Sequence, residues 1–303
     1  MIDPKYFEQV KLLLRLLPAI ARIPEFALHG GTAINLFHHN MPRLSVDIDL
    51  TFLPFKNRQS DLKKIRELLK GLSGNLVRMI PGLRIENPVY ADAEYKLFCS
   101  SGSSLVKVEV NTVIRGIIDQ PEVRIMCESA QQFFDCYLEM NIVPESQLFG
   151  GKIVAALDRQ HPRDLFDVRM MLSSKGLTDD IMKGFLFCML NANRPLHEIL
   201  NPIFNDQRSA LDNQFKGMAG EAFSYEMFES ARYSLLKQVN HRLSVDDKEM
   251  IIAFSEGHLV GRAIEWRQFP GVKWKLLNIQ KLKESNPEKF NHQVNLLKEL
   301  LVS

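Results

Sequence analysis

FALHGGTAINLFHHNMPRLSVDIDLTF, residues 26–52, is the stretch that decides the fold. A short apolar run ends in a Gly-Gly pair (residues 30–31), and the AINLFHH that follows is typical of a helix, so the order is strand, tight turn, helix. In LSVDIDLTF (residues 44–52) apolar and polar side chains alternate, which predicts a strand with one polar face. Asp47 and Asp49 are two positions apart on that strand, so both carboxylates point to the same side of it.

A later strand, LVKVEVNTVI (residues 105–114), carries Glu109 on its polar face and is able to pair beside the first. Carboxylates that converge on one spot raise one another's pKa values, and divalent cations relieve the repulsion. Mg²⁺ prefers carboxylate oxygens and substrate phosphates, and two such ions about 3.5–4 Å apart clamp the attacking and leaving oxygens of a displacement at phosphorus. We therefore predict that Asp47, Asp49 and Glu109 hold Mg²⁺, as one or two ions, with Mn²⁺ as a substitute. For Glu109 an ordinary exposed position is the alternative.

The Gly-Gly turn offers a place for the phosphates of a nucleoside triphosphate (NTP). It leaves backbone N–H groups at the positive end of the helix dipole, and a side chain there would hold the phosphates away. We predict a nucleotide-binding set around the turn that comprises Gly30, Gly31, Thr32, Arg43 and Ser45. For Arg43, structural pairing with an aspartate is an equal alternative to phosphate contact.

The composition is that of an ordinary globular protein and restricts the function only weakly. The 303 residues are 46% hydrophobic and 24% charged, enough for two domains, and a net charge of +2 neither indicates nor excludes a nucleic-acid partner. The four cysteines are far apart, which argues against a zinc site or a disulfide framework. No secretory signal pattern and no apolar run of membrane-spanning length is present, so we expect a cytoplasmic protein with no membrane partner.

The character of the sequence changes near residue 125, after which helical periodicity dominates. We therefore predict an α+β protein whose residues 1–125 form the core that carries the metal-binding carboxylates, and whose residues 126–303 form a helical domain. The helices expected in the second half span residues 129–139, 145–159, 162–173, 178–190, 206–216, 220–240, 245–256 and 287–302.

Three stretches together resemble one known family. GGTAINLF and RLSVDIDLTF resemble the first motif of the DNA polymerase β-like nucleotidyltransferase superfamily, and more narrowly that of the AbiEii/AbiGii toxin family. SQLFGGKIVAALDR is similar to the family's lysine-containing helix and places Lys152, and HPRDLFDVRMML is similar to its R-D-x-x-D helix and places Arg163, Asp164 and Asp167. One departure is Thr32, at a position where much of the superfamily has serine.

The resemblance implies a fold and an activity. It implies a mixed sheet flanked by helices, Mg²⁺-dependent transfer of a nucleotide from an NTP, and a toxin whose cognate antitoxin is a protein partner. It also implies that Lys152 and Asp167 are catalytic together with Asp47 and Asp49, and that Lys152 and Asp164 contact the nucleotide. From the residues alone, a surface lysine and a solvated acidic helix face are the plainer alternatives for Lys152 and for the Asp164/Asp167 pair.

The acceptor of the nucleotide is a separate question. Residues 261–303 carry eight lysines and arginines against four glutamates, with Trp266 and Trp274 between them, a combination able to bind and stack an RNA end. Because some members of the resembled family modify tRNA, we expect an RNA acceptor, namely tRNA. Alternatives are a small molecule such as an aminoglycoside, a protein hydroxyl, or a non-catalytic binding module. Three histidines lie near the turn, namely His29, His38 and His39. Histidine is a common metal ligand and acid–base group, but no second cluster of residues at metal-ligand spacing accompanies these three.

Overall fold

The computed structural model describes residues 2–86 and 95–302, which divide into two compact units. Unit 1 comprises Met1–Pro144 and Phe215–Ala222, and unit 2 comprises Glu145–Gln214 and Phe223–Ser303. The boundary therefore lies at Pro144 rather than at residue 125, because two further strands that follow residue 121 extend the sheet of unit 1. The pattern of AEYKLFC, SSGSS and LVKVEVNTVI, residues 93–114, also predicts a β-hairpin, and its first two residues lie outside the described part of the chain.

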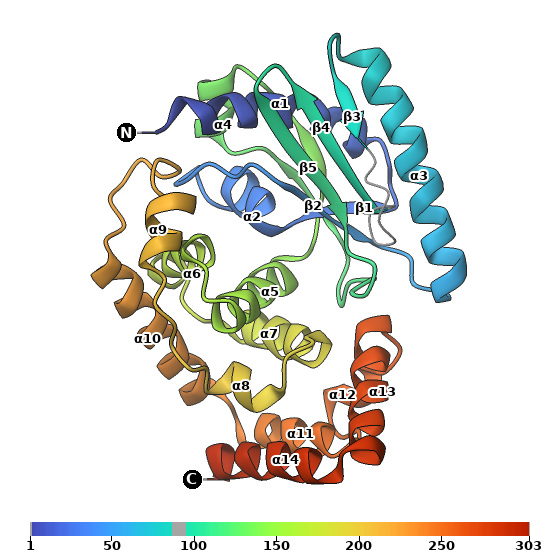
Figure 1. The fold of residues 1–303 in the computed structure, drawn as a ribbon, viewed down its shortest axis with the longest axis vertical. Coiled ribbons are helices and arrows are strands. Elements are labelled where there is room, and N and C mark those ends of the chain that lie inside the picture. Colours follow the sequence, from blue (N-terminus) through green and yellow to red (C-terminus); the bar gives the residue numbers. More distant parts are fainter. Residues whose placement is uncertain (1, 87–94, 303) are drawn as a thin grey trace. The chain divides into compact units, whose positions relative to one another are not determined.

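A mixed sheet of seven strands forms the centre of unit 1 in the described part of the chain (Figure 1). The strands are β1 (Phe26–His29), β2 (Ile48–Phe52), β3 (Arg84–Glu86), β4 (Lys96–Ser101), β5 (Ser104–Val110), β6 (Glu122–Ile125) and β7 (Glu139–Ile142). Their spatial order is β3-β4-β5-β2-β1-β7-β6. β1 pairs antiparallel with β2 and parallel with β7, β2 pairs parallel with β5, and the remaining pairs are antiparallel. This mixed sheet and the helices beside it confirm the expected α+β class.

The helices of unit 1 begin with a long buried one. They are α1 (Pro4–Ala21), α2 (Gly30–Ala33), its π-helical continuation η1 (Ile34–His38), α3 (Arg58–Met79) and α4 (Glu128–Phe134). We expected α1 to stop near Pro18, but it continues for three further residues. Proline removes one backbone hydrogen bond, and the fully buried side chains of Leu13, Leu17 and Ile20 on both sides of Pro18 keep the helix packed.

The strand predicted over residues 44–52 is regular only from Ile48 onward. Before it, Arg43 forms an isolated bridge with Ala219, and the Leu44 N–H donates to the Met218 carbonyl at 2.8 Å. The segment of residues 215–222 thus belongs to unit 1, and its backbone pairs with Arg43 and Leu44. No local signal predicts such a contact, because its partner lies about 170 positions along the chain.

Unit 2 consists of helices in the described residues. They are α5 (Glu145–Asp158), α6 (Pro162–Ser174), α7 (Asp179–Asn191), α8 (Leu196–Leu200), α9 (Arg208–Gln214), α10 (Tyr225–Arg242), α11 (Val245–Ser255), α12 (Arg262–Trp266), α13 (Pro270–Ser285) and α14 (Pro287–Val302). None of the described helices is both long and apolar enough to cross a membrane.

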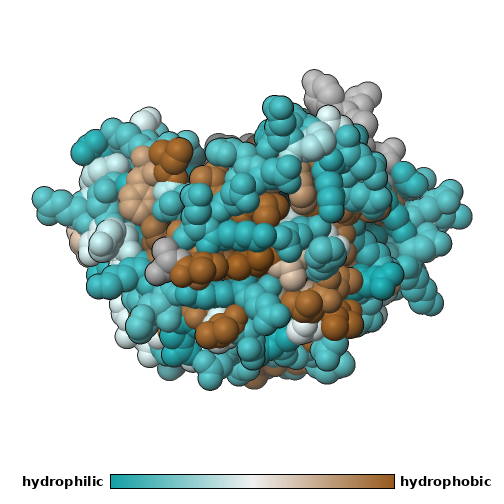
Figure 2. Space-filling model, turned by 90° about the horizontal axis from the view of Figure 1, so that it is seen from below, coloured by the Kyte–Doolittle hydropathy of each residue, from teal (hydrophilic) through white to brown (hydrophobic). Residues whose placement is uncertain are grey.

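Helix α13 was not expected, because a charged residue is buried on it and large apolar residues are exposed, the reverse of the usual amphipathic pattern. Lys275 is buried, and its ammonium donates to the Ala192 and Arg194 carbonyls at 2.6 and 2.5 Å, beyond the end of α7. Trp274 beside it is 47% exposed and Leu277 is 59% exposed. Seen from below, Figure 2 shows brown apolar patches among hydrophilic side chains. A buried cation and exposed apolar side chains obscure the helical pattern.

Two glycines allow α5 and α7 to approach closely. A Cβ built on Gly184 would lie 1.9 Å from the Ser146 carbonyl oxygen, and one on Gly150 would lie 2.2 Å from the Gly184 carbonyl carbon. These are contacts with backbone, which cannot rotate away. The position of α5, and with it that of Lys152, therefore depends on glycine at both sites.

We expect Gly184→Ala to lower the melting temperature (Tm) by roughly 4–12 °C, because overpacking against backbone costs about 1–3 kcal/mol or more. Gly71→Ala is the matched control, since Gly71 lies within α3 and a Cβ there meets nothing within 4 Å. It should leave Tm unchanged or raise it. Thermal unfolding followed by circular dichroism measures both, and equal Tm values for the two variants would contradict the close packing.

Candidate functional site

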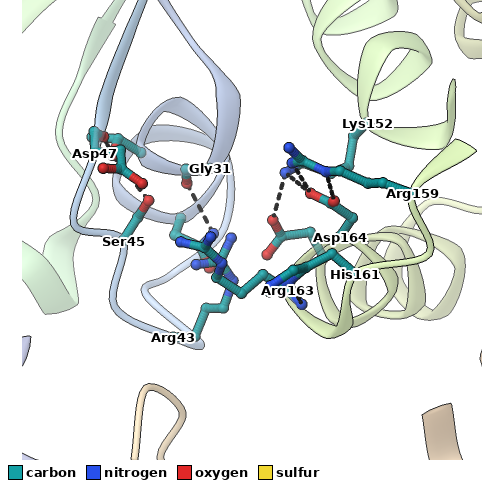
Figure 3. Close-up of polar contacts among 12 residues, drawn as sticks. Gly31, Arg43, Ser45, Asp47, Lys152, Arg159, His161, Arg163 and Asp164 are labelled. Atoms are coloured by element: carbon teal, nitrogen blue, oxygen red, sulfur yellow. Dashed lines mark hydrogen bonds and ion pairs between the residues drawn. The ribbon is translucent and has the colours of Figure 1, made fainter. Parts of the chain in front are cut away.

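The turn between β1 and α2 brings side chains directly against backbone. Gly30 has φ +70°, in the left-handed region that favours glycine. A Cβ on Gly30 would lie 2.3 Å from Asp49 Oδ2, and one on Gly31 would lie 2.7 Å from Arg43 Nη2. The glycine pair therefore makes room for a carboxylate on one side and a guanidinium on the other. Figure 3 shows Gly31 with Arg43, Ser45 and Asp47.

Asp47 and Asp49 stand at the start of β2. Asp47 directly precedes the strand, and Asp49 lies opposite His29 of β1 and Glu109 of β5 in the sheet register. Both aspartates are half-buried, between the buried residues Val46, Ile48 and Leu50. The alternation read from the sequence is thus present, and the two carboxylates remain accessible beside the Gly30 turn.

Glu109 is next to Asp49 in register, but lysines hold its carboxylate. Lys107 lies 2.7 Å from it and Lys96 lies 3.0 Å from it. Burial alone would raise the pKa of Glu109, but hydrogen bonds and charge from both lysines lower it overall. Burial would lower the pKa of Lys107. The hydrogen bond and charge of Glu109, together with the charges of Asp47 and Asp49, outweigh burial and raise that pKa overall. Among the described residues no three His, Cys, Asp or Glu side chains are preset to hold a metal.

The remaining predicted nucleotide contacts of unit 1 are largely enclosed. Thr32 is fully buried, and its hydroxyl lies 3.0 Å from Ser45 Oγ and 2.5 Å from the Asp47 carbonyl oxygen. Arg43 is 2% exposed and donates from Nη1 to the Leu44 carbonyl at 2.9 Å. Thr32 thus ties the turn to the aspartate strand, which explains a hydroxyl at this position without phosphate contact.

A second group of predicted residues forms one ion-pair cluster within unit 2. Lys152 of α5 places Nζ 2.9 Å from Asp164 Oδ1 and 3.2 Å from Asp167 Oδ2, both on α6. The two carboxylates are 1% and 0% exposed, and the lysine side chain is 7% exposed. Their i, i+3 spacing on one helix face, read from the sequence, is what lets both meet the same lysine.

Arg159 completes this cluster and was not anticipated. Its Nε and Nη2 lie 2.6 and 3.0 Å from the Asp164 carboxylate, and its side chain is 63% exposed (Figure 3). It follows Lys152 by seven positions, two helical turns, so the face shared with Lys152 was a usable signal. Arg163 lies next to Asp164 on α6, where its N–H donates to the ring of His161, the N-cap residue.

The cluster pairs two cations, Lys152 and Arg159, with two buried carboxylates. Burial would raise the pKa of Asp164, but Lys152 first and then Arg159 hold it well below its usual range. Asp164 is therefore ionised at neutral pH, with a buried ammonium on one side and a largely exposed guanidinium on the other. The guanidinium is the more exposed of the two cations, since the Arg159 side chain is 63% exposed and that of Lys152 is 7% exposed.

The site residues thus form two groups, Asp47 and Asp49 with the glycine turn in unit 1, and Lys152 with Asp164 and Asp167 in unit 2. Among the three histidines near the turn, His29 lies opposite Asp49 in the sheet register. His38 and His39 are half-buried at the end of η1.

One comparison with known proteins identifies the family, and another shows a similar fold. The profile of "Nucleotidyl transferase AbiEii toxin, Type IV TA system" matches residues 11–232. No curated protein matches the chain. A similar solved structure is MenT4, a nucleotidyltransferase toxin from Mycobacterium tuberculosis H37Rv, at a TM-score of 0.61 and 13% sequence identity, over 91% of this chain and 93% of that one. At this identity the structural likeness shows the fold, and the profile match shows the family.

Proposed function

The chain belongs to the AbiEii family of nucleotidyltransferase toxins of type IV toxin–antitoxin systems, and from this premise we propose that it transfers a nucleotide from an NTP to an RNA, namely tRNA. The family implies an NTP substrate and an antitoxin partner.

The observation that carries the proposal is the pair of accessible aspartates against a glycine turn. Gly30 lacks the Cβ that would collide with Asp49, so this carboxylate sits where only glycine leaves room. Two half-buried carboxylates, one just before β2 and one on it, suit a hard divalent cation such as Mg²⁺. When bound, the metal would supply Lewis-acid stabilisation of charge that develops on phosphate oxygens.

The roles of the other residues follow from what each contacts. We propose Asp47 and Asp49 as the metal ligands. Glu109 would join them when its ion pairs with Lys96 and Lys107 break. Backbone N–H groups at Gly30 and Gly31 suit phosphate binding because no side chain stands in front of them.

For the cluster in unit 2 we propose phosphate binding through charge. Lys152 is oriented by Asp164 and Asp167, and Arg159 presents its exposed guanidinium edge. Arginine suits planar, two-pronged contact with phosphate oxygens, and lysine acts as a point charge. Asp167 fixes the lysine ammonium in place, which is the part we assign to it in catalysis.

The RNA acceptor is supported by the exposed face of α13. Lys273, Trp274 and Lys281 lie exposed along this helix, whereas Trp266 packs in the core with its ring centroid 5.5 Å from that of Phe187. One exposed tryptophan beside lysines is able to stack on a base and attract phosphates. Trp266 therefore has no part in the acceptor proposal.

The test is incubation of the purified protein with Mg²⁺, total tRNA and each α-³²P-labelled NTP in turn. Label should enter tRNA with one or more NTPs and should depend on Mg²⁺ or Mn²⁺. No label with any NTP and any RNA, in the presence of either metal, would reject the RNA acceptor. Label in a small molecule or in protein instead would show that the acceptor is not RNA, while nucleotide transfer itself would be confirmed.

A further inference from the structure

The corner between α5 and α6 has an unusual conformation. Gln160, between Arg159 and His161, has φ +52°, which places a long side chain in the left-handed region. Its side chain is not exposed to solvent, since the residue is 2% exposed. Such a conformation persists only where surrounding contacts hold it.

The amide of Gln160 is held on both sides. Its Nε2 donates to the Ile203 carbonyl at 2.8 Å, and its Oε1 accepts from Arg232 Nη1 at 2.8 Å and from the Asn205 N–H at 3.3 Å. Hydrogen bonds of the Gln160 side chain therefore connect the corner to the segment before α9 and to α10. All of these residues belong to unit 2.

Arg232 is a buried cation that also donates from Nη1 to the Asn205 carbonyl at 2.8 Å. It is 3% exposed, with its guanidinium 4.1 Å from the centroid of the Phe204 ring. Its only carboxylate contact in the described residues is Glu229, 2.5 Å away and itself 42% exposed. Its Nε has no hydrogen-bond partner in that part of the chain. A buried charge with an unsatisfied donor costs stability, and an apolar residue there would avoid that cost.

The corner sets the geometry of the ion-pair cluster. The residue before Gln160 is Arg159, which binds Asp164, and the residue after it is His161, the N-cap from which α6 starts. A change of the corner would alter both the direction in which α6 leaves and the reach of Arg159. Lys152 on α5 and Asp164 on α6 would then no longer meet at 2.9 Å.

We propose that Gln160 and Arg232 are positioning residues that hold the α5–α6 corner so that Lys152, Arg159 and Asp164 meet in one cluster. This rests on the proposed role of that cluster in nucleotide transfer. Neither residue touches the substrate; each acts through the residues that the corner carries.

The first variant is Gln160→Gly, because glycine adopts the left-handed conformation without strain and lacks the amide. We expect kcat to fall about 10- to 100-fold, with KM for the NTP changed by less than about threefold, since small misplacements of catalytic groups act on the transition state. Gln160→Glu keeps the acceptor for Arg232 but loses the donor to the Ile203 carbonyl, so its kcat should lie between that of Gln160→Gly and that of the wild type.

Asn240→Ala is the matched control on the same helix as Arg232. Asn240 also ties α10 to a backbone carbonyl, donating to Leu200 at 3.0 Å, but away from the corner. It should lower Tm about as much as Gln160→Gly and leave kcat unchanged. If both variants lower Tm equally and both keep kcat, Gln160 is merely structural and the proposal is overturned.

A second readout does not need activity. The Tm shifts of Gln160→Gly and Lys152→Met should fail to add in the double variant, because the first already disturbs the cluster that the second removes. Those of Asn240→Ala and Lys152→Met should add. Additive shifts in both cases would overturn the positioning role. A wild-type protein without transfer activity would instead reject the proposed function, so the two failures are distinguishable.

Discussion

Asp49→Asn is expected to abolish nucleotide transfer, with a loss of at least ~10³-fold in kcat/KM, while the protein remains folded. The substitution keeps the size of the side chain beside Gly30 and removes the charge that would bind the metal. Stabilisation of developing phosphate charge by a metal is worth several kcal/mol, and each 1.4 kcal/mol is about a factor of ten.

The stability of this variant should change much less than its activity. Without metal, removal of the Asp49 charge relieves its repulsion with Asp47 but also removes an attraction to Lys107, so the two effects on Tm oppose each other. Mg²⁺ with a non-hydrolysable NTP analogue should raise the Tm of the wild type and leave that of Asp49→Asn unchanged, because only the metal-binding form gains from ligand binding.

Asp135→Asn is the control for this experiment. Asp135 is an exposed carboxylate of the same unit, with φ +47°, a conformation that asparagine tolerates. Activity and Mg²⁺ response should both stay at the wild-type level. Full activity of Asp49→Asn, or an undiminished Mg²⁺ response, would remove Asp49 from the metal site.

Lys152→Met is expected to lower both activity and stability strongly. Lys152 is the buried cation between Asp164 and Asp167, and its removal leaves two buried carboxylates with the largely exposed Arg159 on one of them. Breaking a buried pair from one side costs about 3–5 kcal/mol, or roughly 10 °C in Tm for a unit of this size. Transfer should fall by ~10²–10³-fold, the usual effect of losing one charge-stabilising donor.

Neutralising the partners should separate these two effects. In Lys152→Met/Asp164→Asn/Asp167→Asn no uncompensated charge is left buried, so most of the lost Tm should return while activity stays lost. A triple variant as unstable as Lys152→Met would show that packing, and not charge, makes Lys152 important for stability.

The pH dependence of Tm gives an independent check. In the wild type the lowered pKa of Asp164 contributes stability that is complete above the pKa of an unfolded aspartate and is lost as acid titrates the group through its folded pKa. Without Lys152, burial is opposed only by Arg159 and the pKa of Asp164 rises. Acidification from about pH 7 to about pH 5 should therefore narrow the Tm gap between Lys152→Met and the wild type. A constant gap would contradict the charge explanation.

Local pattern was sufficient for much of the core. The alternation around Asp47 and Asp49 gives two half-buried carboxylates at the start of β2, and a glycine pair after a short apolar run gives a turn. Both depend on neighbouring residues only, through side-chain period and backbone freedom. Asp164 and Asp167 were likewise predictable as neighbours on one helix face.

Other features depend on residues far apart in the chain, and no local pattern encodes them. The sheet continues past residue 125 into β7, because β1 accepts a parallel neighbour from after residue 138. Thr32 is buried against Ser45 and the Asp47 carbonyl, and Lys96 reaches Glu109 from the neighbouring strand, contacts that only the packing and the strand register decide.

The sequence by itself determined which residue types are available to this protein: paired carboxylates on a strand, a glycine turn, and a lysine and two aspartates on consecutive helices. Only the tertiary structure decided which of them meet, since Lys152 reaches Asp164 through a left-handed corner that Gln160 and the distant Arg232 fasten. The physical reason is that side-chain period is fixed by the backbone of one element, whereas burial and ion pairing are fixed by contacts between elements.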